Sequence, residues 1–279
     1  MKLIALGDNC VDVYQNLDEV HPGGNAVNVA VHAARCGAQA EYLGSFGTDG
    51  YSDVLRQALI ENNVSIEHCP VLPGSTTKQC CYDVIDGERS FRGVIEGDSW
   101  AGPVRIGEKE LAELKTADVI VTSCNAKIPQ YLKEIENLPP VFVFDFGEKE
   151  KYRTEAYCEQ VCGAIDLAMF SCDPMSDEEF RSFADAMHAR NIIHVLATMG
   201  AQGQILSNGK EIIRKTVSQV IPHDTMGAGD SFLAAFVTDL AAAGWKKGEV
   251  MPADVLIGAI EEGQRVSAEN CLSAGGFGF

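Results

Sequence analysis

Residues 224–230 read Asp-Thr-Met-Gly-Ala-Gly-Asp, and an apolar stretch, residues 231–244, follows at once. Gly227 and Gly229 lack a Cβ, so the backbone there can turn its N–H groups toward an anion, and the dipole of a following helix attracts negative charge. This pattern predicts an anion-binding loop that leads into a helix N-terminus. Asp230 does not fit a simple anion site, because its carboxylate would repel the ligand.

Two interpretations of Asp230 follow. In the first, Asp230 takes a proton from a hydroxyl group that attacks a phosphate. In the second, Asp230 is the N-cap of the helix and the glycines only form a tight turn. Residues 224–230 alone leave both interpretations open.

Size and composition are typical of a globular enzyme. The 279 residues suffice for one large α/β domain or for one domain with an appendage, and 46% hydrophobic residues is ordinary for a packed core. No apolar run reaches the roughly 20 residues of a membrane span. Residues 1–7 are also too short for a secretory signal before Asp8 interrupts them. We therefore expect a cytoplasmic protein with no membrane partner.

The spacing of the cysteines and the net charge indicate which ligands and partners the protein can bind. The ten cysteines include no C-x-x-C pair and no Cys/His cluster at zinc spacing, so we expect reduced thiols that are mostly small core residues. The formal net charge of −18 argues against nucleic acid as a partner, since nucleic acid rewards clusters of lysine and arginine. A polyphosphate must then be attracted by backbone N–H groups, a few local cations and a bound metal.

Strand-like and helix-like segments alternate along the chain. The pairs are 2–6 and 25–36, 41–44 and 51–62, 119–122 and 129–137, 141–144 and 154–163, and 167–170 and 177–190. Such alternation predicts a mainly parallel sheet with helices on both faces. Ligands of that architecture bind at the carboxyl ends of the strands.

One segment interrupts this alternation. Residues 77–84 and 89–93 are strand-like and flank Asp86-Gly87, a strong hairpin signal. We expect an inserted β-arm, residues 75–97, that covers a site or pairs with another subunit; an ordinary surface hairpin is the alternative. A second hairpin is predicted around residues 208–209, between strands 204–207 and 210–215.

Three further glycine-rich stretches accompany the first. Residues 22–28 (PGGNAVN) open the first helix, where paired glycines allow a close backbone approach and two asparagines offer amides to a polyhydroxy ligand. Residues 44–50 (GSFGTDG) place Asp49 to cap a helix or to bind a hydroxyl. Residues 198–203 (TMGAQG) follow a strand, where a nucleotide phosphate can approach the backbone. Each stretch has a plain structural alternative, a tight turn or a helix cap.

Taken in order, the four stretches resemble the ribokinase-like (PfkB) family of carbohydrate kinases, and the resemblance runs from Gly7 to about Gly278. It implies one domain over residues 1–279: a three-layer α/β/α sandwich with a mainly parallel central sheet and a small β-sheet lid. It implies transfer of the γ-phosphate of ATP to a sugar hydroxyl. A non-catalytic sugar or nucleotide sensor on the same fold is the alternative, although a sensor would have no use for Asp230.

The resemblance assigns roles to individual residues. Asp230 matches the catalytic base, and Gly227, Ala228 and Gly229 match the anion hole at the helix N-terminus. The expected sugar-binding residues are Asp8, Asn9, Asp12, Gly23, Gly24, Asn28 and Glu96. The expected nucleotide-binding residues are Thr198, Gly200, Gly203 and Thr225. The β-arm matches the lid, which in this family often forms a dimer contact, so a homodimer is one expectation.

The metal site departs from the family pattern. Members often carry an N-x-x-E motif that organises Mg²⁺, whereas residues 171–179 read SCDPMSDEE. Ser176 and Glu179 have capping-box spacing and so favour a helix start. Asp173 is the candidate substitute. Mg²⁺ is still expected because ATP brings it, and a monovalent cation such as K⁺ is a further candidate cofactor.

Shorter stretches narrow the resemblance to members that phosphorylate fructoselysine at its 6-hydroxyl. These are residues 7–14, 96–97, 144–146, 224–227 and 275–278. Fructoselysine carries a secondary ammonium beside its sugar, with which Asp8, Asp12 or Glu96 could pair. Fructose, ribose, 2-keto-3-deoxygluconate and a nucleoside such as adenosine remain alternative acceptors.

Overall fold

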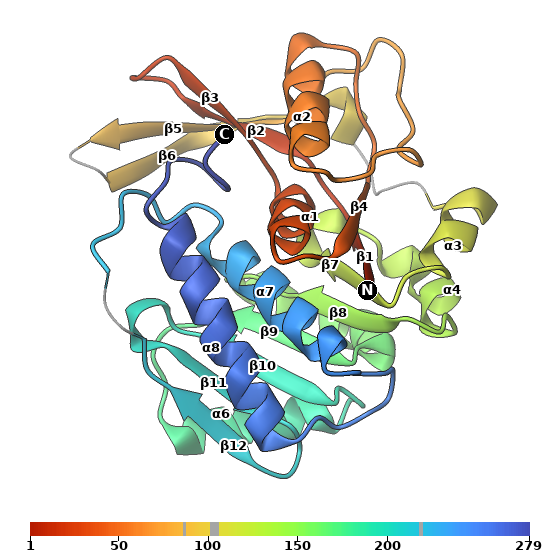
Figure 1. Ribbon diagram of the computed structural model, residues 1–279, viewed down its shortest axis with the longest axis vertical. Helices are drawn as coiled ribbons and strands as arrows, with labels where there is room; N and C mark the ends of the chain where they lie inside the picture. The colour runs from red at the N-terminus through yellow and green to blue at the C-terminus, as the bar shows by residue number, and fades with distance from the viewer. Residues whose placement is uncertain (86–87, 101–105, 218–219) are drawn as a thin grey trace.

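A computed structural model describes residues 1–85, 88–100, 106–217 and 220–279. Its main sheet has eight strands in the order β12-β11-β10-β9-β8-β7-β1-β4 (Figure 1). In chain order these strands are β1 (Lys2–Leu6), β4 (Gln39–Leu43), β7 (Val119–Ser123), β8 (Val141–Asp145), β9 (Leu167–Ser171), β10 (His194–Thr198), β11 (Gln204–Ser207) and β12 (Ile212–Lys215). Pairing is parallel from β4 to β10 and antiparallel from β10 to β12.

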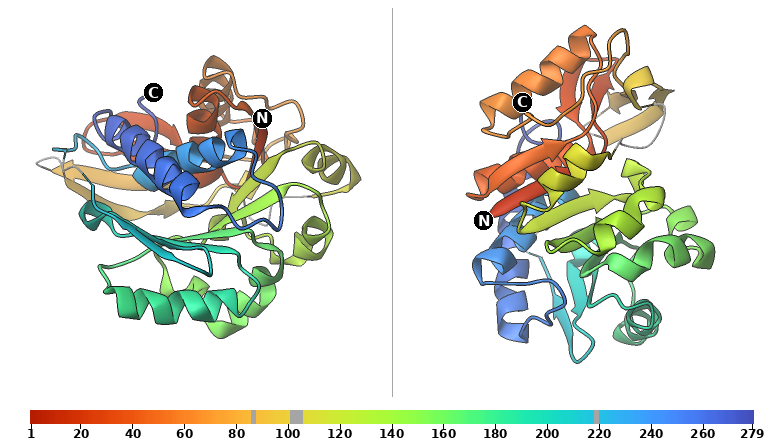
Figure 2. Two further views of the ribbon diagram at one scale, coloured as in Figure 1. Left: turned by 60° about the horizontal axis from the view of Figure 1, so that its bottom comes forward. Right: turned by 90° about the vertical axis from the view of Figure 1, so that its right-hand side faces the viewer.

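Helices cover both faces of this sheet, as Figure 2 shows for α7 and α8 on one side and α6 on the other. The α-helices are α1 (Asn25–Arg35), α2 (Gly50–Glu61), α3 (Glu108–Leu114), α4 (Leu132–Glu136), α5 (Glu155–Val161), α6 (Asp177–His188), α7 (Ala228–Ala242) and α8 (Ala253–Asn270). Short 3-10 turns lie at Asp98–Trp100, Cys124–Ala126, Pro129–Tyr131, Glu150–Tyr152, Cys162–Ala164 and Gly200–Gln202.

Two hydrophobic cores follow from the alternation of side chains along the strands. On β1, Leu3 and Ala5 pack in one core with α1, α7 and α8, whereas Ile4 and Leu6 pack in the other with α4, α5 and α6. The predicted three-layer α/β/α arrangement is therefore confirmed. Among the described residues, none of the helices combines the length and the apolarity needed to cross a membrane.

A second, four-stranded sheet with the order β3-β2-β5-β6 stands apart from the main sheet (Figure 1). Its strands are β2 (Cys10–Tyr14), β3 (Glu19–Gly23), β5 (Gln79–Ile85) and β6 (Glu88–Ile95). The predicted β-arm thus contributes β5 and β6, while the hairpin residues 86–87 lie outside the described residues. Strands β2 and β3 were not expected, because the chain after Gly7 reads as a loop.

The start of α7 differs from the sequence-based expectation. The helix begins at Ala228 rather than near Ser231, because Gly227 adopts a left-handed φ of 70° and its carbonyl accepts the N–H of Ser231 at 2.8 Å. Asp230 therefore lies within the first turn, and the N-cap interpretation of Asp230 is wrong. Two smaller differences are that the segment 129–137 is a 3-10 turn followed by α4, and that β12 begins at Ile212.

Candidate active site

The N-terminus of α7 follows a glycine turn at Gly227, in the segment that was predicted to bind an anion. A Cβ at Gly227 would lie 2.4 Å from the carbonyl oxygen of Gly276, so the neighbouring chain as well as the φ angle requires glycine here. A Cβ at Gly229 would meet nothing within 4 Å, so the turn borders open space there. Because the first N–H groups of a helix lack intrahelical acceptors, this end of α7 is suited to bind an anion.

Asp230 is held by two amides from α1. Asn28 Nδ2 donates to Oδ2 at 2.7 Å, and Asn25 Nδ2 donates to Oδ1 at 2.6 Å. Burial raises the pKa of Asp230 to about 7, and the charges of Asp145 and Asp8 act in the same direction, while the two amide hydrogen bonds oppose them. At neutral pH this carboxylate can therefore both accept and release a proton.

Asp145 is a second buried carboxylate beside Asp230. It ends β8, and Asn25 Nδ2 also donates to its Oδ2 at 2.9 Å, while the N–H of Gly147 donates to Oδ1 at 2.8 Å. Burial raises the pKa of Asp145 to about 6. Sequence reasoning did not assign this residue to the site. The available signal was an acid at the carboxyl end of the apolar strand 141–144.

Asp8 and Asn9 both follow β1, but their side chains make different contacts. Asp8 is buried, with Oδ2 at 3.8 Å from Lys78 Nζ, and its Oδ1 accepts no hydrogen bond from the described residues. Burial raises the pKa of Asp8 in spite of Lys78. Asn9 instead donates inward, to Tyr42 Oη and to the carbonyl of Ser45, both at 2.8 Å, so its amide holds the loop.

The other expected sugar-side residues surround this loop. Asp12 is buried on β2. A Cβ at Gly23 would lie 2.6 Å from its Oδ2, so glycine leaves room for this carboxylate. Gly24 takes a φ of 109°, and a Cβ there would lie 2.8 Å from the carbonyl oxygen of Asp8, so glycine lets α1 begin against the loop. Glu96 is exposed just after β6.

Lys78 lies near two of these acids, Asp8 and Glu96, and was not predicted. Burial lowers the pKa of Lys78, but the charges of Asp8, Cys10, Cys80 and Glu96 outweigh burial and raise it. The ammonium group therefore remains charged among the carboxylates. Nothing in the sequence around this lysine indicates a site, because β5 reaches the loop after β1 only through the pairing of β2 with β5.

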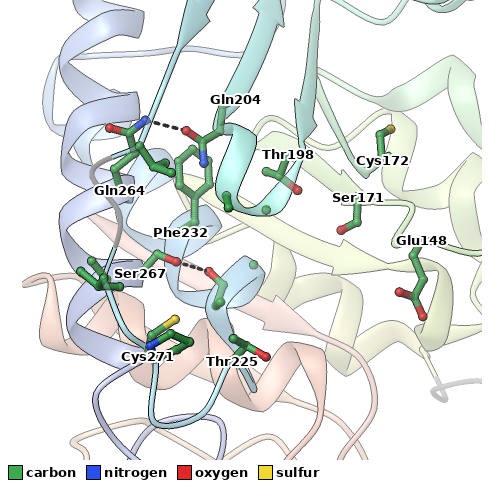
Figure 3. Close-up of a pocket in the computed structure, with 18 of the residues that line it drawn as sticks. Glu148, Ser171, Cys172, Thr198, Gln204, Thr225, Phe232, Gln264, Ser267 and Cys271 are labelled. Carbon is green, nitrogen blue, oxygen red and sulfur yellow. Dashed lines mark hydrogen bonds between the residues drawn. The ribbon is translucent and has the colours of Figure 1, made fainter. Parts of the chain in front are cut away.

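A cleft of about 1130 Å³ lies on the other side of the α7 N-terminus (Figure 3). Of the predicted residues it is lined by Thr198, Gly200, Thr225, Ala228, Gly229 and Asp173, and its apolar lining includes Val217, Val220, Pro222, Phe232 and Ala268. Gly203 has a structural task instead, because a Cβ there would lie 2.0 Å from the carbonyl oxygen of Lys215. The cleft and Asp230 thus meet at one helix end.

Oxygen ligands for a hard cation border the same cleft. Glu148, Glu150 and Asp173 line it, and all three side chains are exposed. Carboxylates of this kind suit Mg²⁺, which binds through one or two carboxylates, water and substrate phosphates. Ser176 forms the predicted capping box, since its N–H donates to Glu179 Oε2 at 2.8 Å and its Oγ accepts from the N–H of Glu179.

Two further acids of the glycine-rich stretches are structural. Asp49 caps α2 by accepting the N–H of Ser52 at 3.0 Å, and it also accepts the N–H of Thr77 at 2.8 Å. Asp224 accepts a hydrogen bond from Tyr14 Oη at 2.7 Å and from the N–H of Gly275 at 2.9 Å. These contacts tie α2 to the segment just before β5, and they tie the C-terminal tail to β2 through Asp224.

The chain belongs to the pfkB family of carbohydrate kinases, whose sequence pattern it matches over residues 1–275. The protein is therefore a sugar kinase, a phosphotransferase that acts on an alcohol group, and ATP is the expected donor for this family. The predicted family membership and the ribokinase-like fold are both confirmed.

Three known proteins illustrate the relationship. The chain is 31% identical to fructosamine kinase FrlD of Bacillus subtilis, over 100% of this chain and 94% of the relative. It is 32% identical to fructoselysine 6-kinase of Escherichia coli, over 90% of this chain and 92% of the relative. The fold matches the crystal structure of fructokinase with bound ATP from Xylella fastidiosa with a TM-score of 0.80, at 15% identity and over 99% and 94% of the two chains.

Proposed function

We propose that this kinase phosphorylates fructoselysine, or a closely related fructosamine, at the 6-hydroxyl of the sugar. The position of Asp230, hydrogen-bonded in the first turn of α7 beside the open face at Gly229, supports the phosphoryl transfer. The activities named for two relatives at 31% and 32% identity support the acceptor. The residue roles described next are parts of the same proposal.

In this mechanism Asp230 accepts the proton of the acceptor hydroxyl as that oxygen attacks the γ-phosphorus. The new P–O bond forms while the bond between the γ-phosphorus and the β–γ bridging oxygen breaks, and ADP leaves with that electron pair. The N–H groups around Gly227, Ala228 and Gly229 stabilise the charge on the transferred group. Asn25 and Asn28 orient the carboxylate, and its pKa of about 7 suits a base at neutral pH.

The nucleotide is assigned to the cleft between Thr198 and Thr225. Its apolar wall at Phe232 and Ala268 suits a nucleobase, and the α7 N-terminus lies at the phosphate end. Bound Mg²⁺ would neutralise the β- and γ-phosphate oxygens, with Asp173 and the nearby Glu148 as the residues that hold it, directly or through water. The requirement for K⁺ rests on the family resemblance, and comparing rates in potassium and sodium salts tests it.

The acids around Lys78 support a cationic acceptor. Asp8 and Glu96 act on the one ammonium group of Lys78, and buried Asp12 adds a further carboxylate on the neighbouring strand β2, so the acceptor side carries an excess of negative charge. The unpaired Oδ1 of buried Asp8 offers an acceptor for a donor on the ligand. The secondary ammonium of fructoselysine supplies such a donor with a charge, which a plain hexose lacks.

ADP release tests the proposal directly. The purified enzyme with MgATP should turn over fructoselysine faster than glucoselysine, fructose, ribose, 2-keto-3-deoxygluconate and adenosine, and phosphorus NMR should place the phosphate on the 6-oxygen. Turnover of another member of this panel alone would refute the acceptor and leave the kinase reaction intact. Turnover of none of them, with tight binding of a sugar or of ATP, would favour the sensor.

We also propose that the small sheet pairs two copies of the chain. Its exposed apolar side chains include, among those that the structure describes, Val20, Ile85, Phe91, Val94 and Ile95. Apolar residues gathered on an open sheet are typical of a subunit contact. Light scattering should give the mass of a dimer for the wild type and the mass of a monomer for Phe91→Asp. A monomeric wild-type enzyme would contradict the contact.

A further inference from the structure

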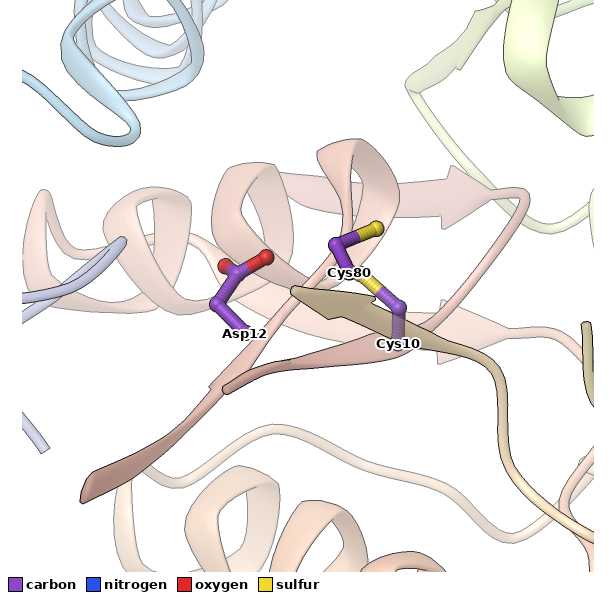
Figure 4. Close-up of side chains that lie close together, drawn as sticks. All are labelled: Cys10, Asp12 and Cys80. Atoms are coloured by element: carbon purple, nitrogen blue, oxygen red, sulfur yellow. The ribbon is translucent and has the colours of Figure 1, made fainter. Parts of the chain in front are cut away.

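Two cysteines and an aspartate converge on one side of the small sheet. Cys10 and Asp12 are two residues apart on β2, so their side chains share a face, and Asp12 lies opposite Cys80 in the parallel register of β2 and β5. Figure 4 shows the three side chains together. Both Sγ atoms and a carboxylate oxygen lie within 4.8 Å of one another.

This spacing fits a thiophilic metal ion. Zinc binds thiolate sulfur at about 2.3 Å and carboxylate oxygen at about 2.0–2.2 Å, so ligand atoms in a tetrahedral site lie roughly 3.3–3.8 Å apart. The three side chains need only small rotations to reach such distances. Two sulfurs favour zinc or cadmium over Mg²⁺, which prefers oxygen ligands.

The charge around the three ligands also fits a divalent ion. Two thiolates and one carboxylate carry three negative charges, and a divalent cation leaves one. Lys78 supplies a positive charge beside the group to offset the remaining negative one, because it is held next to β2 by the N–H of Val11 and its ammonium lies 3.8 Å from Asp8. In the other group of suitable side chains among the described residues, Glu41, His68 and Glu113, both carboxylates already pair with the ammonium of Lys2.

We propose that Cys10, Asp12 and Cys80 form a binding site for a thiophilic divalent cation such as Zn²⁺, which inhibits the kinase by taking Asp12 from the sugar. Binding replaces the two thiol protons, which pass to solvent, and forms two metal–sulfur bonds and one metal–oxygen bond. The fourth position stays open to water or another small ligand. The site itself is independent of the proposed function, whereas the inhibition rests on the role of Asp12 in sugar binding.

The site changes the interpretation of these cysteines. Zinc motifs are recognised in sequence by close spacing, but Cys80 lies 70 residues after Cys10 and meets it only through the pairing of β2 with β5. The expectation that the cysteines are mostly small core residues holds for buried thiols such as Cys158. It does not describe Cys80, which is only half-buried.

Cadmium binding tests the site without reference to activity. The reduced, metal-free protein titrated with CdCl₂ should develop the ultraviolet charge-transfer band of cadmium thiolate, saturating at one ion per chain. Cys80→Ser should weaken cadmium binding by more than about tenfold. Loss of a residue that only hydrogen-bonds to a metal ligand already lowers metal affinity by at least that factor, and Cys80 is a ligand itself. Cys80→Ala, with circular dichroism to verify folding, guards against a variant that fails for other reasons.

Cys81→Ser is the matched control, because the next residue of the same strand points to the opposite face. It should bind cadmium as the wild type does. An absent band in the wild type, or an equal band in Cys80→Ser, would overturn the metal site. So would a loss of two free thiols that persists after a chelator has removed the metal, since chelation releases coordinated thiolates but not a disulfide formed by dissolved oxygen.

Inhibition is then measured with buffered Zn²⁺. The KM for the sugar should rise with zinc in the wild type and in Cys81→Ser, while the KM for MgATP changes little, and Cys80→Ser should resist the effect by more than about tenfold in zinc concentration. A cadmium band accompanied by an unchanged sugar KM would refute the role of Asp12 in sugar binding and leave the metal site supported. The two failures are thus distinguishable.

Discussion

Asn25 donates from its side-chain nitrogen to Asp230 at 2.6 Å, and the same nitrogen lies 2.9 Å from Asp145. One amide therefore stands between two buried carboxylates whose charges disfavour each other. It lowers the pKa of both, while burial raises both. The proton affinity of Asp230 is thus set by a balance that each neighbour shifts in a known direction.

Replacing Asp230 by Asn should remove the base. We expect kcat to fall by about 10²–10⁴-fold, the usual contribution of general base catalysis, with KM values within a few-fold of the wild type. Steady-state ADP release measures both. Asp239→Asn, a change of the same kind further along α7, is the control and should keep the wild-type rate. Full turnover by Asp230→Asn would refute the assignment.

Changing the two neighbours should move the pH profile in opposite directions. In the proposed mechanism the carboxylate of Asp230 is the active form, so we expect the rate to fall at low pH with a midpoint near the pKa of about 7. Asn25→Ala removes a hydrogen bond that lowers this pKa, so the midpoint should rise. Asp145→Asn removes a charge that raises it, so the midpoint should fall. Profiles of kcat/KM against pH measure both, and shifts of the same sign would contradict the arrangement.

Substitution of two glycines in the same turn should affect stability in one case and activity in the other. Gly227→Ala adds a Cβ at a positive φ and 2.4 Å from Gly276, so we expect a loss of about 1–3 kcal/mol in the free energy of unfolding. Gly229→Ala adds a methyl into open space at the anion hole, so stability should hold while kcat falls. Denaturant unfolding and kcat measure the pair, and equal stability of the two variants would contradict the account.

Asp8 should discriminate between charged and neutral acceptors. Asp8→Asn removes the carboxylate but keeps a polar side chain of the same size. We expect kcat/KM for fructoselysine to fall at least about tenfold more than kcat/KM for fructose, because a charge-assisted hydrogen bond is lost only with the cationic substrate. Asp83→Asn, on β5, serves as the control. An equal loss of kcat/KM on both sugars would contradict the proposal that Asp8 binds the ammonium group.

The predictable part of the molecule is the part that local patterns determine. The alternation of strands and helices predicted the main sheet, and residues 224–230 predicted a glycine turn that leads into a helix, because each depends on neighbours in the chain. Strand β2 was missed because it carries Asp12 at its centre and follows Gly7-Asp8-Asn9, a sequence typical of a loop. Its identity depends on pairing with β5, about 70 residues away.

The same dependence on local sequence explains which site residues were predicted and which were missed. Asp230 was predicted because a glycine-rich turn precedes it directly in the sequence. Asp145 and Lys78 were not predicted, because each reaches the site through the order of strands, which no local motif encodes. The amide of Asn9 was assigned to the sugar, yet it bonds Tyr42 and Ser45, a contact that depends on how β4 lies beside β1.

The hydrogen bond from Tyr14 to Asp224 joins the strand that carries Asp12 to the turn that precedes the anion hole. Asp224 also accepts the N–H of Met226 at 2.9 Å on its other oxygen, so one carboxylate connects β2 to the backbone of that turn. A shift of β2 on sugar binding would therefore alter the free energy of the turn. The affinities for sugar and nucleotide then become thermodynamically linked, and each substrate changes the binding of the other by the same factor.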